Sequence, residues 1–477
     1  MNAKVRCESA VLKEKFMENN LKNPEQWAKL AEVAPADVVA SLKKLAAAFD
    51  GKKIIEWMAN LWEPEVGGFY YNNSARDTEG FAPDIESTHQ LINMLCANAS
   101  VKRENLPEDF KAKMLNFIKS CQSPDDGYFY HPQWPKGREN LQNDRYGRDL
   151  NWSTAFINLT TLDEDGDGVQ KKQYPNYCIL GHKCKKHAGT DERCVFPPDP
   201  PKPASASAAS SSKPDFSSRE AFSAWLEQYN ANAKEHSGRA HQLSSLGGII
   251  SNYGYTDIVL DHLDKLQEEI YQEQLAAGEE PMGVWQKQLD YLAVWGLLKY
   301  GTFYNNANYG REIKHAEEII KTCIKVIALP PEGNYPPDGC YRMNDMFNQW
   351  LGINTLINNL KRFNPEKVDV VRKILCEDVV PLIDNSLLKI QAMALDDGTF
   401  TYTSDRHSLK RIYGVPISLG LEESDVNCMA LVTIMYRGVF LALGYDPVDI
   451  NDAEDVELFF KIIGEAKPPV KKPNPNA

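Results

Sequence analysis

The segment from residue 67 to residue 90 gathers side chains of the types that acid–base chemistry uses. It holds four aromatic residues, one arginine, four carboxylates and one histidine around the start of a mostly apolar helix. A carboxyl group walled by aromatic rings is poorly solvated, so its pKa rises toward the range of a general acid. Asp84 and Glu86 are therefore candidate catalytic residues. The candidates for binding a substrate in this segment are Tyr70, Arg76, Asp77 and Glu79.

Both catalytic candidates also have a structural interpretation. Asp84 follows Pro83 and has Ser87 three residues later, a pattern in which the aspartate side chain caps a helix and contributes about 1 kcal/mol. Glu86 falls in the first turn of the same helix, where a negative charge favours the helix dipole. The sequence leaves the choice between capping and catalysis open.

A second charged segment, residues 125–152, repeats the order of turn, aromatic residues, charged loop and apolar helix. Arginine binds carboxylates in a bidentate manner, which suits the arginines of this loop to holding an acid or hydroxyl groups. Asp149 is the third catalytic candidate, whereas Asp126 precedes a glycine and is interpreted as a turn former. The binding candidates of this segment are Tyr128, His131, Arg145 and Arg148.

Polar and aromatic residues also occur at the starts of the remaining apolar helices. These further binding candidates are Trp285, Asp290, Tyr291, Tyr341, Asn344, Asp425 and Asn427. Aromatic rings could stack on the flat apolar face of a ligand, but aromatic residues at helical spacing more often belong to a core. His89 and His241 take matching places in two similar segments, where a histidine is more often structural than catalytic.

One acidic stretch resembles the beginning of a calcium loop. Asp163, Asp165 and Asp167 match the first ligands of that motif, but the position of the bidentate glutamate is Tyr174. A surface acidic turn is therefore the favoured interpretation. The cysteines and histidines of residues 178–194 match no standard zinc motif, although they leave a structural metal open. We expect no cofactor.

The helices that must position these residues are of two kinds, which alternate along the chain. One kind is amphipathic, as in residues 107–119, where Phe110 and Phe117 lie on one face. The other kind carries few charges and has apolar residues all round, as in residues 289–298 and 426–443, which predicts burial on both faces. Since strand patterns are few, the sequence predicts an all-α fold with inner helices wrapped by outer ones.

An internal repeat supports this arrangement. Five times, a turn of glycine and an aromatic residue precedes a helix of the inner kind. A sixth inner helix is expected near residue 238, where the residues AHQL echo the THQL of residues 88–91. Such units cannot bury their apolar faces alone, so they stack on their neighbours. The sequence predicts a ring of six helical hairpins, and an irregular helical array without a closed ring stays open.

We interpret the chain as one domain, residues 1–466, with a helical extension at residues 1–44. The cysteine-, histidine-, proline- and serine-rich residues 161–214 are expected to be a loop inserted into the ring, and residues 467–477 a disordered tail.

The two turns CQSPDDGYF, from Cys121, and LDDGTF, from Leu395, resemble those of the α/α-toroid superfamily. This superfamily includes six-hairpin glycosidases, polysaccharide lyases, terpene cyclases and protein prenyltransferases. The resemblance covers most of residues 45–460 and implies an (α/α)6-type toroid with a central cleft. The zinc ligands of the prenyltransferases are not matched, because no histidine follows His407, and the DxDD and DDxxD motifs of terpene cyclases are absent. The carbohydrate-active branch is the one that remains.

Composition and charge restrict the partners. The formal net charge is −13 and 43% of the residues are hydrophobic, so a polyanion such as nucleic acid and an acidic membrane surface are both disfavoured. The first 18 residues do not resemble a secretory signal, and most of the ten cysteines are scattered singly. We therefore expect a cytoplasmic protein.

These observations favour a glycoside hydrolase that uses cleft carboxylates on an oligosaccharide. Glycoside cleavage usually needs two carboxyl groups, whereas a lyase needs a base such as Tyr or His and a group that neutralises a uronate. The chain contains both sets, so a polysaccharide lyase stays open. A cyclase on the same ring and a binding protein that catalyses nothing are further alternatives.

Overall fold

The structure is a computed structural model. It describes residues 21–122, 129–130, 133, 148–149, 152–153, 156, 214–230, 240–329, 342–412 and 415–476. Several of the sequence predictions lie outside the described residues. These are the predictions for Tyr128, His131, Arg145, Tyr341, Asp163, Asp165, Asp167 and most of the predicted insertion.

The described chain is predominantly helical, which confirms the all-α prediction. Its longer helices are α2 (Pro24–Val33), α3 (Ala36–Ala46), α4 (Gly51–Asn60), α6 (Ile85–Asn98), α7 (Glu108–Ser120), α9 (Arg219–Asn230), α12 (Thr256–Ala276), α13 (Tyr291–Tyr304), α14 (Ala316–Ala328), α15 (Met343–Phe363), α16 (Glu366–Cys376), α17 (Val379–Gln391), α18 (Val426–Leu443) and α19 (Ala453–Glu465). The short ones are α5 (Asn73–Arg76), α10 (Ala240–Ser245) and α11 (Gly247–Asn252), with a 3₁₀ turn at Arg103–Asn105. Two small antiparallel pairs join β1 (Trp62–Glu63) to β2 (Gly68–Phe69) and β3 (Arg411–Ile412) to β4 (Val415–Pro416).

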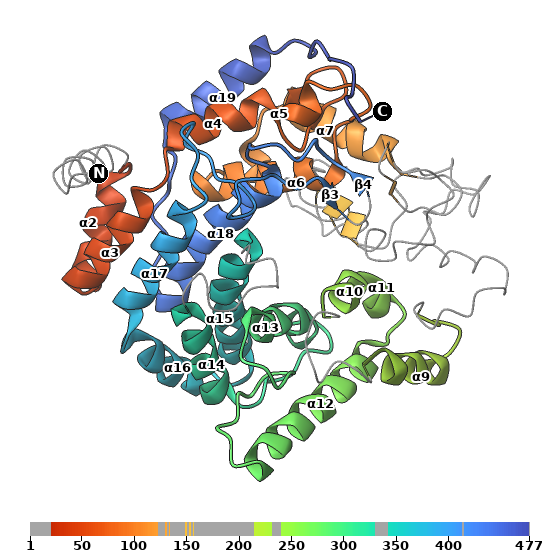
Figure 1. The fold of residues 1–477 in the computed structure, drawn as a ribbon, viewed down its shortest axis with the longest axis vertical. Coiled ribbons are helices and arrows are strands. Elements are labelled where there is room, and N and C mark those ends of the chain that lie inside the picture. Colours follow the sequence, from red (N-terminus) through yellow and green to blue (C-terminus); the bar gives the residue numbers. More distant parts are fainter. Residues whose placement is uncertain are drawn as a thin grey trace, which may run out of the picture.

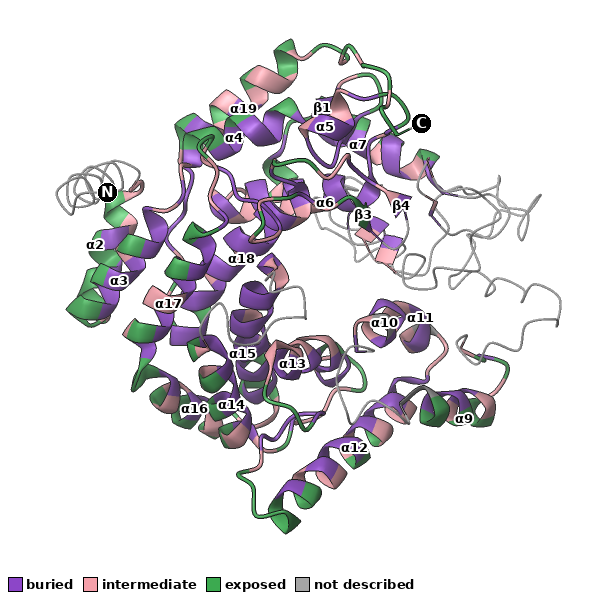
Figure 2. Cartoon of the chain, in the orientation of Figure 1, coloured by how far each residue is buried: buried purple, intermediate pink, exposed green. Residues whose placement is uncertain are grey.

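The two expected kinds of helix are both present. Helix α14 is amphipathic, because it buries Ile320 and Cys323 and exposes Lys321 and Lys325. Helices α13, α15 and α18 lie among other helices and are buried over most of their length, as Figure 2 shows.

The buried helices follow one another in an arc. Helix α6 packs on α18, α18 on α15, α15 on α13 and α13 on α10, while α4, α14, α16 and α17 lie on the outside of this arc (Figure 1). The first residues of the arc helices carry most of the polar side chains that the sequence predicted to act together. The arc therefore sets the relative positions of the site residues.

Two glycines allow α13 and α15 to approach closely. A Cβ atom at Gly301 of α13 would lie 2.1 Å from Cγ2 of Thr355, and one at Gly352 of α15 would lie 2.6 Å from Cγ1 of Val294. Each helix thus offers a glycine to a branched side chain of the other.

The two ends of the described chain are packed on the body. Lys22 pairs with Asp455 at 2.7 Å, Trp27 contacts Phe440, and α19 lies along α4. The C-terminal segment differs from the expected disordered tail. It runs along the loop before α6, where Lys472 exchanges backbone hydrogen bonds of 2.8 Å with Asp77 and Glu79. This pairing satisfies backbone groups that composition alone suggested would face water.

One described helix, α18, is long and apolar enough to cross a membrane by length and composition, and 78% of it is buried inside the structure. Its packing against α15 and α6 accounts for its apolar surface.

Candidate active site

Three of the predicted site carboxylates cap inner helices. Asp84 accepts hydrogen bonds from the backbone N–H groups of Glu86 and Ser87 at the start of α6. Asp290 accepts one from Ala293 at the start of α13, and Asp425 caps α18. Satisfying the free N–H groups of a helix start is the ordinary role of such residues. Their primary role here is therefore to fix the positions of the helix starts.

Asp425 is the most strongly perturbed of these caps. Its side chain is fully buried, and its two oxygens accept backbone N–H groups of Cys428 and Leu409, both at 2.8 Å. Burial raises the pKa of Asp425 to about 7, with smaller contributions from the charges of Glu423 and Glu86, while the two N–H groups oppose the shift.

Asp425→Asn should make folding stability less dependent on pH. Because the pKa of Asp425 lies above its ordinary value of 3.8, the folded chain holds a proton that the unfolded chain has released, and stability falls as pH rises toward 7. Between pH 5 and pH 8 the free energy of unfolding of the parent chain should fall by about 2 to 3 kcal/mol more than that of the variant. Urea unfolding at the two pH values measures the difference, and parallel losses would contradict the assignment.

Glu86 is the centre of a network that joins three inner elements. Its side chain is fully buried, and Oε1 accepts Nη2 of Arg148 at 2.6 Å and Nε2 of Gln90 at 3.1 Å. Nη1 of Arg148 lies 3.3 Å from Nε2 of His241 in α10. The side-chain amide of Gln90 also donates to Oδ1 of Asn427 in α18, at 3.2 Å. The structure thus brings together Glu86, Arg148 and Asn427, which the sequence predicted separately.

Aromatic rings flank this network. The guanidinium of Arg148 lies over the Trp152 ring, 4.3 Å from its centroid. The ring of His89 also stacks on that of Trp152, with 6.1 Å between the ring centroids. Trp295 of α13 contacts His241 at 5.6 Å and stacks on Tyr291. The predicted binding residue Tyr291 therefore joins the site through Trp295.

The two histidines are neutral near pH 7. Burial lowers the pKa of His89 to about 3, and the Arg103 charge adds to the shift. Burial also lowers the pKa of His241 well below its ordinary value, with contributions from Lys299 and Arg148. A neutral imidazole can accept a hydrogen bond but contributes no charge to the site.

Two further predicted residues, Asp149 and Asn344, are among the described residues. Asp149 is fully buried and follows Arg148 in the chain. Asn344 is half-buried in the first turn of α15, next to Asp345, whose carboxylate accepts the backbone N–H of Arg342 at 2.7 Å.

Trp285 belongs to the core, not to a ligand site. It is fully buried, its ring contacts Tyr300 and Tyr304, and its indole N–H donates to the backbone oxygen of Leu263 at 3.0 Å. The sequence could not separate it from ligand-facing aromatic residues, because both occur near the start of an inner helix.

The remaining residues of the first charged segment face the C-terminal segment. Arg76 forms a bidentate pair with Asp77, and the Tyr70 hydroxyl donates to Glu63 at 3.0 Å. Nζ of Lys471 lies 4.6 Å from the Tyr70 ring centroid, and Glu79 is exposed. These four candidates thus support the loop before α6 and do not lie in the Glu86 network.

Removing residues 467–477 should loosen this loop. The deletion removes the backbone pairing of Lys472 and the Lys471 contacts, which together contribute about 2 kcal/mol. We expect faster hydrogen exchange at residues 70–84 and unchanged exchange in α14. Lys471→Met keeps the backbone pairing and should give a smaller effect, and equal exchange in all three chains would count against the role of the segment.

Two polar residues in this region were missed by the sequence reasoning. The Tyr71 side chain is buried near Glu86, Asp425 and Arg148, and its hydroxyl has no hydrogen-bond partner among the described residues. Lys299 lies on α13 near Arg148 and Glu86. The sequence could have pointed to Lys299, because it is the only charged residue of α13. Tyr71 carried no signal that separated it from Tyr70.

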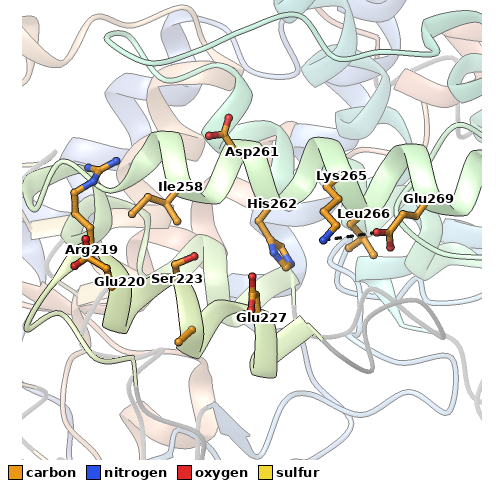
Figure 3. A pocket seen from close by; sticks show the side chains of 11 residues that line it. Arg219, Glu220, Ser223, Glu227, Ile258, Asp261, His262, Lys265, Leu266 and Glu269 are labelled. Atoms are coloured by element: carbon orange, nitrogen blue, oxygen red, sulfur yellow. Dashed lines mark ion pairs between the residues drawn. The ribbon is translucent and has the colours of Figure 1, made fainter.

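A separate groove of about 910 Å³ lies between α9 and α12. Its walls alternate in charge, with Arg219, Asp261, Lys265 and Glu269 among the lining residues, and Glu227 faces His262 across it (Figure 3). It includes none of the Glu86 network. Among the residues that the structure describes, no group of three His, Cys, Asp or Glu side chains could hold a metal ion.

Comparisons of this chain with models of protein families, with curated proteins and with solved structures found no match. The functional argument therefore depends on the geometry of the site.

Proposed function

We propose that this chain is a carbohydrate-active enzyme that cleaves glycosidic bonds in an oligosaccharide. The observation that carries the proposal is the buried Glu86 network, which combines a carboxylate, a guanidinium and two amides. The indole ring of Trp152 contacts Arg148 of this network, and that of Trp295 contacts His241. Carboxylates and amides suit sugar hydroxyl groups, and aromatic rings suit the apolar face of a pyranose.

The carboxyl groups of Glu86 and Asp425 differ in environment, as glycoside cleavage requires. The ion pair with Arg148 favours the charged form of Glu86, so we assign it the role of base or nucleophile in place of the acid role expected from the sequence. Asp425, whose pKa is raised to about 7, is the candidate proton donor.

The Tyr71 hydroxyl favours one alternative reaction, elimination by a polysaccharide lyase. Its hydroxyl has no hydrogen-bond partner among the described residues and lies near the Arg148 charge, which could neutralise an acid. Burial and the nearby carboxylates raise the pKa of Tyr71 well above its ordinary value, so in an elimination it would donate a proton to the leaving group. Hydrolysis consumes water and releases a saturated sugar, whereas elimination leaves a double bond in the product.

We further propose that the arc closes into an α/α toroid of six hairpins. Contacts connect α6, α18, α15, α13 and α10 in that order, and the bonds from Glu86 through Arg148 to His241 connect α6 back to α10. The free thiols of Cys323 and Cys428 support a cytoplasmic setting.

A screen of oligosaccharides, uronate-containing ones included, tests the proposal. We expect new reducing ends and saturated products that are absent from reactions with Glu86→Gln. Unsaturated products would select the lyase, and an absence of turnover across neutral and acidic sugars would refute the enzymatic function.

A further inference from the structure

Lys299 lies on the same side of α13 as the aromatic residues of the site. Tyr291, Trp295 and Lys299 are spaced four residues apart, so they form one stripe along the helix. Trp295, in the middle of this stripe, contacts His241 of α10. The Lys299 amine is close enough to His241 to affect its protonation, which places it at the Glu86 network.

The Lys299 amine differs from those of the buried Lys111 and Lys389 in having no partner in the part of the chain that the structure describes. Among the described residues, its Nζ makes no hydrogen bond or ion pair, although the side chain is half-buried. By contrast, Nζ of Lys389 donates to the backbone oxygen of Ile327 at 2.9 Å, and Nζ of Lys111 pairs with Glu108 at 2.6 Å. Those two lysines have structural roles, whereas the contacts of Lys299 do not explain its position.

The charges around Lys299 disfavour its ammonium form. Among the described residues, the Arg148 charge disfavours this form and the Glu86 charge favours it, but Glu86 is already paired with Arg148 at 2.6 Å. Burial and the Arg148 charge together lower the pKa of Lys299 to about 7. Near neutral pH a large share of the amine is therefore unprotonated and nucleophilic.

We propose that Lys299 is a reactive amine that binds a small aldehyde or ketone covalently as an imine. The amine nitrogen attacks the carbonyl carbon and forms a C–N bond, and a proton passes from nitrogen to the former carbonyl oxygen. The resulting hydroxyl group takes up a second proton and leaves as water, the nitrogen gives up its remaining proton, and a C=N bond forms, with no net oxidation or reduction. The open-chain aldehyde of a reducing sugar is the ligand that we favour. That choice alone rests on the proposed function.

Reductive trapping with glyceraldehyde tests this proposal on the full chain. The protein is incubated with glyceraldehyde and cyanoborohydride from pH 6 to pH 10, and the adducts are located by peptide mapping. We expect the adduct at Lys299 to form at least about tenfold faster at pH 7 than at Lys287 or Lys325, with half-maximal rate near pH 7. Lys299→Arg should abolish this fast adduct, and Lys389→Arg should leave it in place.

The results distinguish this inference from the proposed function. A rate at Lys299 that rises only near pH 10, or one equal to that of the exposed lysines, would overturn the reactive-amine proposal. Both measurements use the unaltered chain, so they do not depend on the folding of a variant. A fast adduct in a chain that cleaves no oligosaccharide would support the Lys299 proposal and refute only the proposed function.

Discussion

Glu86→Gln should lower kcat on the oligosaccharide found by screening about 10³-fold. The substitution keeps the volume of the side chain and one oxygen that can accept from Arg148, but it removes the negative charge. Loss of a catalytic base or nucleophile typically costs two to four orders of magnitude. Steady-state kinetics with the parent chain and the variant measure the effect.

The control for this substitution is Glu32→Gln on the exposed side of α2. It makes the same chemical change outside the site and should leave kcat within about twofold of the parent value. Thermal unfolding of Glu86→Gln separates catalysis from folding, since Arg148 loses its ionic partner. A folded Glu86→Gln with parental kcat would show that Glu86 supports the structure and not the reaction.

Gly352→Val should lower the free energy of unfolding by about 3 kcal/mol. A Cβ at this position meets Val294 of the facing helix at 2.6 Å, and the extra methyl groups of valine have no space between α13 and α15. The two helices must separate or the side chains must leave their preferred rotamers, and both consequences are costly. Chemical denaturation measures the change.

Gly464→Ala is the matched control in α19. A Cβ at Gly464 meets no atom within 4 Å, so alanine gains helix propensity without a clash. We expect this variant to be more stable by about 0.5 to 1 kcal/mol. If Gly352→Val were as stable as the parent chain, the close approach of α13 and α15 would be incorrect.

Much of the fold could be predicted because the spacing of apolar residues in the sequence indicates which faces of each helix are buried. The apolar residues around α18 and the single apolar face of α7 follow directly from periodicity, and both helices are found where they were expected. The position of the C-terminal segment could not be predicted. Its contacts are backbone hydrogen bonds to Asp77 and Glu79, which leave no pattern in side-chain composition.

The site was predicted less completely than the fold, for a different reason. A carboxylate at a helix start reads the same whether it caps the helix, as Asp84 does, or pairs with a distant arginine, as Glu86 does. Only three-dimensional contacts separate these roles. The importance of Lys299 likewise depends on Arg148, which is far from it in sequence and reaches the same network through the fold.

The contacts between the two ends of the described chain have a consequence for synthesis on the ribosome. The loop before α6 leaves the ribosome early, but its backbone partner Lys472 is made some 390 residues later. In the same way, Lys22 can form its ion pair only after Asp455 has been made. Contacts of such long sequence separation form late. The start of α6, which carries Glu86, therefore reaches its final support only after residue 472 has been made, so a product that stops before that residue would expose an unfinished site.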